Sequence, residues 1–188
     1  MYRPDKLEAI ERETERCGFT MASDRETGAL LRTLAASKPG GRMLELGTGT
    51  GLSACWILSG MDQHARLITV DNDPQVQRIA VEQLDDDPRI TIVCANGAEY
   101  LSDLAGTTFD LIFADAWPGK FNDLDDALGL LVPGGVYVVD DLLPQPSWPA
   151  GHAPKVPLLV ESLRAREDLA IVEMGWSTGI LVASKTSD

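Results

Sequence analysis

A glycine-rich stretch at residues 43–53 constrains the fold of this chain more than any other feature. Met43–Leu46 is an apolar run of the kind that forms a buried strand, and a helical pattern follows the stretch. Between them, Gly47, Gly49 and Gly51 stand at alternate positions. Glycine permits a positive φ and lets the backbone lie against a ligand, while a new helix presents unpaired N–H groups there. The stretch therefore predicts a strand, a loop and a helix that bind a nucleotide-like ligand.

The spacing of the glycines separates two classes of nucleotide loop. A dinucleotide fingerprint requires G-x-G-x-x-G, but Leu52 occupies the position of its third glycine. Glu45 stands two residues before the first glycine. A carboxylate at the floor of the pocket suits a cationic, amine-bearing ligand better than a pyrophosphate. The pattern therefore disfavours an NAD-dependent oxidoreductase, and it resembles the E-x-G-x-G-x-G loop with which class I methyltransferases bind S-adenosylmethionine.

Composition and charge limit the classes of partner. The chain of 188 residues is 44% hydrophobic and 24% charged, which predicts one folded domain over residues 1–188. Its net charge of -13 disfavours a nucleic-acid or anionic-membrane surface, since both require basic patches. No apolar run approaches the ~20 residues of a membrane helix, and the N-terminus lacks a signal-peptide core. We therefore expect a cytoplasmic protein in which Cys55 and Cys94 are buried, reduced thiols.

Strand and helix patterns alternate along the rest of the chain. This alternation predicts an α/β fold with a doubly wound, mostly parallel, Rossmann-like sheet of seven strands. The short connection between the last two strands predicts an antiparallel hairpin at one edge. Ser23 is the expected N-cap of the second helix, with Glu26 completing a capping box. Besides residues 43–46, the expected strands are 66–71, 89–93, 109–115, 136–139, 169–173 and 180–183, and the expected helices are 5–17, 23–38, 52–59, 74–83, 97–101, 122–131 and 158–166.

Acidic residues end several of the expected strands. Asp71, Asp115 and the pair Asp140-Asp141 all stand at carboxyl ends, where open α/β sheets bind their ligands. Asp71 follows the glycine loop by about twenty residues, the spacing at which a carboxylate accepts from both ribose hydroxyls. As an alternative, Asp71 caps the helix that follows it. These acids are more plausible as ligand or cation contacts than as scaffold.

Several stretches together resemble the small O-methyltransferases related to catechol O-methyltransferase. The Asp-x-Trp at 115–117 points most directly to this branch, and the resemblance covers roughly residues 25–143. It implies transfer of a methyl group from S-adenosylmethionine to a hydroxyl of a small molecule, by a protein that is often a homodimer. The matching stretches are Thr27-Gly28, Leu44–Gly47, Gly51–Ser53, Ile68–Pro74, Asn96–Ala98, Phe109–Trp117, Gly134-Gly135 and Val139–Asp141.

The resemblance also implies which residues bind the cofactor. It places Ser53 on the methionine carboxylate and Asp71 on the ribose. Ala98 and Glu99 would flank the adenine, and Trp117 would pack against adenine or the wall of the site. The full expected set is Glu45, Gly47, Thr48, Gly49, Gly51, Ser53, Asp71, Asn72, Gly97, Ala98, Glu99, Asp115 and Trp117.

Asp115, Asp140 and Asp141 match the positions at which the family binds Mg²⁺. Such a metal would hold two oxygens of a catechol-like acceptor and lower the pKa of its reacting hydroxyl. Two departures affect this expectation. Pro118 replaces the family's lysine base, with Lys120 two positions later, and Asp141 replaces the usual asparagine ligand. Lys120 joins the three aspartates as a candidate catalytic residue.

Alternatives to metal-assisted O-methylation remain open on the sequence. Without a metal, Asp140 or Asp141 would act as the general base or stabilise the sulfonium charge, and the acceptor would be a nitrogen or a carboxylate. A non-catalytic module that binds S-adenosylmethionine is the third alternative. His152, in the proline-rich segment 144–157 that would overhang the site, is either a base or a solvated loop residue. Candidates for an apolar acceptor wall, or for ordinary packing, are Phe19, Met21 and Trp148.

Overall fold

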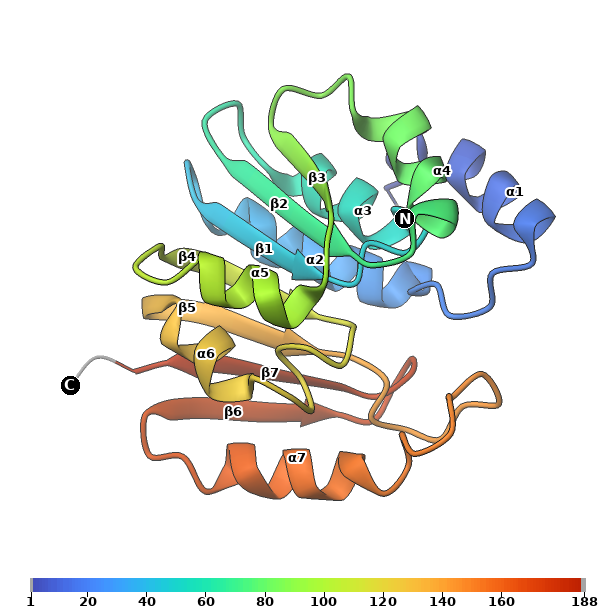
Figure 1. Cartoon of the computed structure of the whole chain (residues 1–188). Helices are drawn as coiled ribbons and strands as arrows, with labels where there is room; N and C mark the ends of the chain where they lie inside the picture. The colour runs from blue at the N-terminus through green and yellow to red at the C-terminus, as the bar shows by residue number, and fades with distance from the viewer. Residues whose placement is uncertain (1, 187–188) are drawn as a thin grey trace.

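The computed structural model describes residues 2–186 and shows a central sheet with helices on both faces (Figure 1). Its strands are β1 (Arg42–Leu46), β2 (Arg66–Asp71), β3 (Ile90–Cys94), β4 (Phe109–Ala114), β5 (Leu131–Val139), β6 (Leu169–Met174) and β7 (Ile180–Lys185). Its helices are α1 (Leu7–Cys17), α2 (Arg25–Ala36), α3 (Leu52–Gly60), α4 (Pro74–Leu84), α5 (Gly97–Asp103), α6 (Leu124–Gly129) and α7 (Lys155–Arg164).

The seven strands form one sheet in the order β3-β2-β1-β4-β5-β7-β6. Strands β1 to β5 pair in parallel, whereas β7 pairs antiparallel with both β5 and β6. This arrangement confirms the predicted doubly wound sheet with an antiparallel edge hairpin. The strand order reverses between β1 and β4, and open sheets of this kind bind ligands at that point, beyond the carboxyl ends of the strands.

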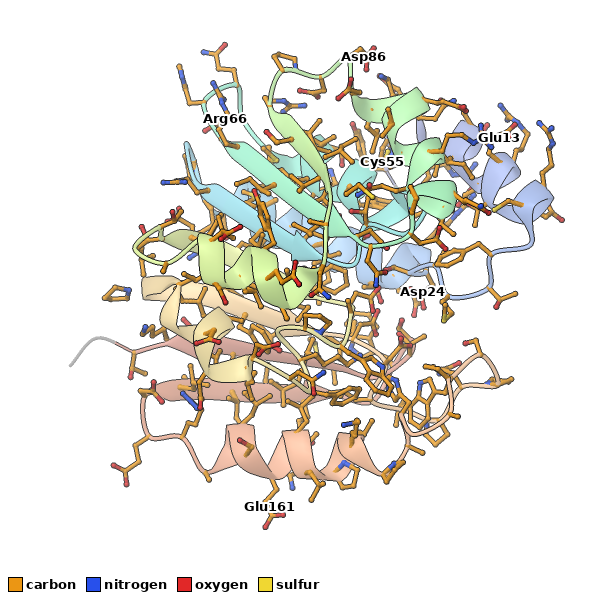
Figure 2. The ribbon with its side chains drawn as sticks, in the orientation of Figure 1. Glu13, Asp24, Cys55, Arg66, Asp86 and Glu161 are labelled. Carbon is orange, nitrogen blue, oxygen red and sulfur yellow. The ribbon has the colours of Figure 1, made fainter. Side chains whose placement is uncertain are left out.

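Two hydrophobic clusters cover the two faces of the sheet. Helices α1 to α4 pack on one face and α5 to α7 on the other (Figure 1). Adjacent residues of β4 alternate between them: Phe113 belongs to the first cluster and Ile112 to the second. Cys55 of α3 (labelled in Figure 2) is buried as expected, but Cys94 is exposed because it ends the edge strand β3. The prediction for Cys94 was therefore wrong.

Local chemistry shifts some element boundaries from their predicted positions. Asp24, rather than Ser23, caps α2, since its side chain accepts from two backbone N–H groups of the first turn. Strand β5 begins at Leu131 because this residue pairs with Phe109, the first residue of β4. The pairing between these strands then shifts in register, so residues 133–135 form an irregularity within the strand rather than a turn before it.

The helices are shorter than a membrane-spanning helix, in line with the absence of a long apolar run in the sequence. The longest helix of the described residues, α2, has 12 residues, whereas a membrane span needs about 20. No helix within residues 2–186 has the length and apolarity to cross a membrane. The single-domain extent of 1–188, the cytoplasmic location, the homodimer and the absence of a nucleic-acid partner stay predictions.

Candidate functional site

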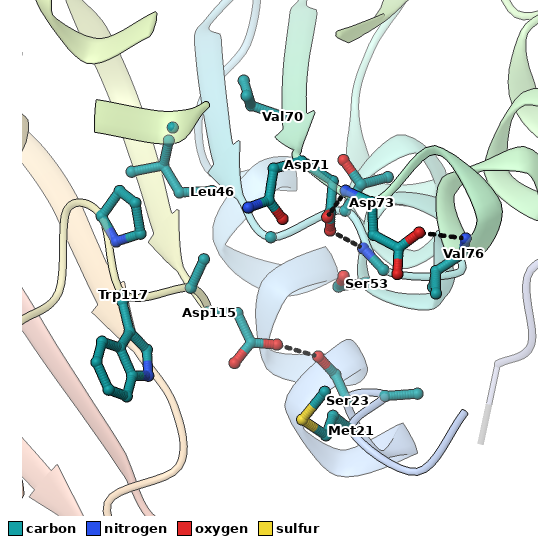
Figure 3. Close-up of a pocket in the computed structure, with 18 of the residues that line it drawn as sticks. Met21, Ser23, Leu46, Ser53, Val70, Asp71, Asp73, Val76, Asp115 and Trp117 are labelled. Atoms are coloured by element: carbon teal, nitrogen blue, oxygen red, sulfur yellow. Dashed lines mark hydrogen bonds between the residues drawn. The ribbon is translucent and has the colours of Figure 1, made fainter. Parts of the chain in front are cut away.

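A cavity of about 420 Å³ lies beyond the carboxyl ends of the central strands (Figure 3). Its walls come from the glycine loop after β1, the turns after β2, β3 and β4, and the segment that precedes α2. The fold thereby gathers most of the predicted cofactor residues around one space. Those that line it are Gly47, Thr48, Gly49, Ser53, Asp71, Asn72, Gly97, Asp115 and Trp117.

Four predicted cofactor residues are not among those that line the cavity. Gly51 has φ +92°, and a Cβ there would lie 2.8 Å from the Cβ of Ala80, so this glycine allows the loop to pack on α4. The N–H groups of Ala98 and Glu99 donate to the Asn96 side chain, which caps α5. Glu45, the fourth, lies beneath the loop. The cofactor roles of all four residues stay predictions.

The glycine loop folds tightly over the ends of β2 and β4. The N–H of Gly47 donates to the carbonyl oxygen of Val70 at 2.9 Å, and a Cβ on Gly47 would lie 3.0 Å from the backbone of Asp115. The N–H of Gly49 donates to the Asp71 carboxylate at 2.7 Å. Gly47 and Gly49 have φ values of +107° and +50°, which side chains disfavour. Glycine at these positions therefore brings the loop backbone to the cavity wall.

Glu45 ends a buried chain of hydrogen bonds beneath this loop. The Gln77 amide donates to the carbonyl oxygen of Val93 at 2.9 Å and to the Thr48 hydroxyl at 3.1 Å. Thr48 and Thr69 are 2.7 Å apart, and the Thr69 hydroxyl donates to one oxygen of Glu45 at 2.5 Å. The Gln77 amide nitrogen can only donate, so the Thr48 hydroxyl donates to Thr69 and the Thr69 hydroxyl donates to Glu45. The chain fixes the glycine loop relative to β2 and α4.

The second carboxylate oxygen of Glu45 is buried without a hydrogen-bond partner. Burial raises the pKa of Glu45 to about 7, since a buried carboxylate loses its hydration, and the hydrogen bond from Thr69 together with the nearby Ser53 hydroxyl compensates only in part. An unpaired buried acceptor beneath a ligand loop favours positive charge above it. The placement of Glu45 therefore fits a cationic cofactor, although the residue supports the loop rather than lining the cavity.

Asp71 faces the cavity, and its role as a helix cap is excluded. Its two oxygens accept from the N–H groups of Gly49 at 2.7 Å and Asp73 at 3.0 Å (Figure 3). Asp73 caps α4 instead, because its side chain accepts from the N–H groups of Gln75 and Val76. The Asp71 carboxylate is thus held in place while each oxygen keeps a lone pair for a ligand hydroxyl.

The acids after β4 and β5 converge at the opposite end of the cavity. Asp115 accepts from the Ser23 hydroxyl at 3.1 Å, and burial together with the charge of Asp140 raises the pKa of Asp115 well above its usual range. Asp140 is buried and accepts from the Thr178 hydroxyl and from the N–H of Asp141, and burial raises the pKa of Asp140 to about 6. Asp141 has φ +59°, a strained value for this residue, and lines the cavity.

Lys120, a candidate catalytic residue that stands two positions late in the motif, reaches the same end of the cavity. Gly119 has φ +76°, and its carbonyl oxygen accepts from the buried Tyr137 hydroxyl at 2.7 Å. The N–H of Lys120 donates to the carbonyl oxygen of Trp117 at 3.1 Å. This tight turn buries the Lys120 side chain to 2% exposure. Burial lowers the pKa of Lys120, while the charges of Asp115 and the aspartates after β5 oppose that effect.

The acidic residues do not form the predicted Mg²⁺ site. Within residues 2–186, no group of three or more His, Cys, Asp or Glu side chains is placed so that it can hold a metal ion. Both hydrogen bonds to Asp140 end on its Oδ1, and the buried Lys120 already supplies a cationic side chain among the three acids, whose charges act on it. The donor set of Asp115, Asp140 and Asp141 therefore does not fit the metal, and the metal assignment has no support from this geometry.

The segment before α7 closes the cavity, as predicted for residues 144–157. His152 is buried rather than solvated, and its Nε2 lies 3.0 Å from the carbonyl oxygen of Asp141. Its ring stacks on Trp148, with the ring centres 4.4 Å apart, and meets the edge of Phe121. Burial lowers the pKa of His152. Other lining residues for which no site role was predicted from the sequence are Ser23, Val76, Asn96 and Pro149.

Comparison with known proteins identifies the family of this chain. The profile of a family described as a methyltransferase domain matches residues 44–142, more than half of the chain. A candidate O-methyltransferase of Mycolicibacterium vanbaalenii is 37% identical over 117 residues, which cover 60% of this chain and 52% of that protein. A similar protein of Mycobacterium avium is also 37% identical over 117 residues. This chain spans about half the length of the relatives that it matches.

Solved structures share the whole arrangement of the fold. The O-methyltransferase TomG from Streptomyces achromogenes, solved with S-adenosylmethionine, has a TM-score of 0.84 at 23% identity and covers 99% of this chain and 92% of its own. The O-methyltransferase from Bacillus cereus, solved with S-adenosylhomocysteine, has a TM-score of 0.85 at 18% identity and covers 99% and 93%. Such low identity establishes a common fold. Together with the profile match, the observations establish that the chain belongs to the methyltransferase-domain family.

Proposed function

We propose that this chain transfers a methyl group from S-adenosylmethionine to a hydroxyl of a small molecule. The observation that carries the proposal is one cavity of about 420 Å³ with two different ends. Gly49 and Asp71 form an end suited to a nucleoside, and Asp115, Lys120 and Asp141 form an end rich in charge. TomG and the Bacillus cereus enzyme, which share the fold, bind S-adenosylmethionine and S-adenosylhomocysteine in their structures.

The residues around the glycine loop fit this cofactor. Asp71 keeps lone pairs that can accept from the two ribose hydroxyls. Ser53 stands in the first turn of α3, where free backbone N–H groups suit the methionine carboxylate. The unpaired oxygen of Glu45 beneath the loop favours the positive charge of the cofactor. Gly97 lies beside Pro118, and its lack of a side chain leaves room for a flat base.

When bound, the cofactor supplies a methyl group activated by a positively charged sulfur. The chain supplies orientation, exclusion of water and an acceptor for the released proton. The acceptor oxygen attacks the methyl carbon in line, a carbon–oxygen bond forms, and the electron pair of the carbon–sulfur bond leaves with the sulfur. The proton of the acceptor hydroxyl passes to Asp115 or Asp141, whose carboxylates line the cavity.

The acceptor end favours a small molecule with an aromatic or apolar body. Trp117, Pro149 and His152 line it from one side and Met21 lines it from the segment before α2, whereas the ring of Phe19, in the same segment, lies beside Gly49. Such walls bury a planar ring, while the charged residues take a polar group on that ring. The net charge of -13 argues against a nucleic-acid acceptor.

Calorimetry tests the cofactor assignment. Purified protein is titrated with S-adenosylmethionine, S-adenosylhomocysteine and NAD in turn. We expect the first two to bind with one site per chain and NAD to give no heat of binding. Binding of NAD alone would refute the proposal.

An acceptor screen tests the reaction. Release of S-adenosylhomocysteine is measured with panels of phenols, catechols, amines and carboxylic acids. We expect turnover with hydroxyl compounds. Turnover restricted to amines would show that the acceptor class is wrong, and tight cofactor binding without turnover on any panel would favour a non-catalytic binding module.

A further inference from the structure

At the charge-rich end of the cavity, the cation is a side chain of the protein, the ammonium group of Lys120. One carboxylate oxygen of Asp140, Oδ1, accepts from the Thr178 hydroxyl and from the N–H of Asp141, and among residues 2–186 no group of three or more His, Cys, Asp or Glu side chains is placed to hold a metal ion. Lys120 lies in the same region, and the charges of Asp115, Asp141 and Asp140 all act on it. Positive charge at the acceptor end therefore comes from a side chain of the protein.

The ammonium group of Lys120 is held at the cavity near the Phe121 ring, at 5.2 Å, without an oxygen in residues 2–186 that accepts from it. The side chain is 2% exposed and lines the cavity. Among the described residues, no hydrogen bond or ion pair within 4.0 Å involves its ammonium group. The backbone around it is fixed, because the Tyr137 hydroxyl donates to Gly119 at 2.7 Å. The ammonium nitrogen is not among the fully buried atoms that lack a hydrogen-bond partner, so it opens on the cavity, where an oxygen of a ligand can accept from it.

On the basis of the proposed function, we propose that Lys120 supplies the positive charge that a divalent metal would supply at this site, and that its ammonium group binds the ionised oxygen of the acceptor. Methyl transfer by this chain then requires no metal. The acceptor's proton goes to Asp115 or Asp141, the electron pair of the carbon–sulfur bond goes to the sulfur, and Lys120 keeps its protons throughout.

This assignment also narrows the class of acceptor. A divalent metal coordinates two neighbouring oxygens of a catechol-like molecule, whereas an ammonium group is a compact point charge that binds one ionised oxygen. A phenol with one hydroxyl group therefore meets the requirement of the site. The neighbouring hydroxyl of a catechol has no metal to coordinate and is not needed for turnover.

Manganese binding tests the proposal without any acceptor. Wild-type protein loaded with S-adenosylhomocysteine is titrated with Mn²⁺, and free Mn²⁺ is followed by electron paramagnetic resonance. We expect the signal of free Mn²⁺ to stay at full amplitude up to millimolar concentrations. If wild-type protein binds one Mn²⁺ per chain, so that the free signal falls by that amount, and Asp115→Asn does not bind it, the proposal is overturned. Calorimetry on the same preparation measures cofactor binding separately. Absence of S-adenosylhomocysteine binding would refute the proposed function rather than the role of Lys120.

Kinetics on an acceptor from the screen test Lys120 itself. Lys155 provides a matched control, since its ammonium group also lies near Phe121, at 5.9 Å against 5.2 Å for Lys120, but Lys155 is not among the residues that line the cavity. We expect Lys120→Met to lower kcat about 100-fold or more without changing the affinity for S-adenosylhomocysteine. Lys120→Arg, which keeps the charge, should retain part of the activity, and Lys155→Met should match wild type.

Chelation and acceptor structure complete the test. Turnover by wild-type protein should be the same with a chelator and with added Mg²⁺, and a phenol should react as well as the corresponding catechol. Turnover that disappears with the chelator, or a Lys120→Met protein with wild-type kcat, would overturn the proposal. Thermal unfolding of each variant shows whether a loss of turnover is due to a loss of folding. If Lys120→Met does not fold, Lys120→Arg, which keeps the charge, still tests the role of this residue.

Discussion

Replacement of Glu45 by glutamine tests how the buried carboxyl beneath the glycine loop affects stability. Glu45 is fully buried, and burial raises its pKa from an ordinary 4.5 to about 7. Between these values the folded state keeps a proton that the unfolded chain has lost. The stability contributed by this proton is present in full below the pKa of the unfolded chain, and it is lost as the pH rises through about 7.

The size of the effect follows from the two pKa values. A pKa difference of one corresponds to about 1.4 kcal/mol, so a rise from 4.5 to about 7 amounts to about 3 kcal/mol in total. Between about pH 5 and about pH 8 the wild-type protein should lose about 2–3 kcal/mol of unfolding free energy at this group. Glutamine cannot titrate, yet its oxygen can still accept from Thr69, so Glu45→Gln should remove this loss.

Urea unfolding, followed by tryptophan fluorescence, measures the difference at both pH values. The quantity of interest is how the free-energy difference between variant and wild type changes with pH, because any constant effect of the amide cancels. Glu99→Gln, at an exposed carboxyl on α5, is the control and should show no such change. An identical difference for Glu45→Gln at about pH 5 and about pH 8 would refute the reasoning from burial.

Three further variants test the cofactor end, the packing and the Lys120 turn. Asp71→Ala should weaken S-adenosylmethionine binding by about 1–3 kcal/mol in calorimetry, and unchanged affinity would contradict the ribose assignment. Gly28→Ala should destabilise the fold by about 1–3 kcal/mol in urea, because a Cβ there would lie 2.3 Å from the Trp56 ring; Gly129→Ala, with no atom within 4 Å of its Cβ, should not. Tyr137→Phe should cost about 1–3 kcal/mol by leaving a buried carbonyl unpaired, and an unchanged urea midpoint would disprove this.

Residues in the cofactor half of the site were identifiable because their signals are local. The glycine loop, Ser53 and Asp71 lie next to the strand ends that define the cavity, so strand periodicity and glycine spacing were enough to bring them together. Local signals were less reliable for Glu45, which was expected to line the cleft. A pattern of residue types specifies which face of a strand is buried. It does not show whether a buried residue such as Glu45 lies beneath the loop or lines the cavity.

Residues in the acceptor half depend on contacts between distant parts of the chain. Ser23 meets Asp115 across 92 positions, and Thr178 meets Asp140 across 38. His152 was expected to be either a base or a solvated residue, and its burial follows from stacking on Trp148 beneath the loop. No local pattern encodes these contacts, because each depends on how the antiparallel hairpin and the segment before α2 close over the sheet.

By itself, the sequence determined the fold class and the glycine loop that lines the cavity. Alternating apolar periods specify parallel strands covered by helices, and glycines at 47 and 49 specify a loop backbone with positive φ against the ligand. Only the tertiary structure decided what stands at the acceptor end. The hydrogen bond from Tyr137 to Gly119 fixes the turn at residues 117–120 and brings Lys120 to the cavity, whereas the motif spacing alone left its position open. The physical reason is that backbone conformation follows from neighbouring residues, whereas the position of a buried charge follows from every element packed around it.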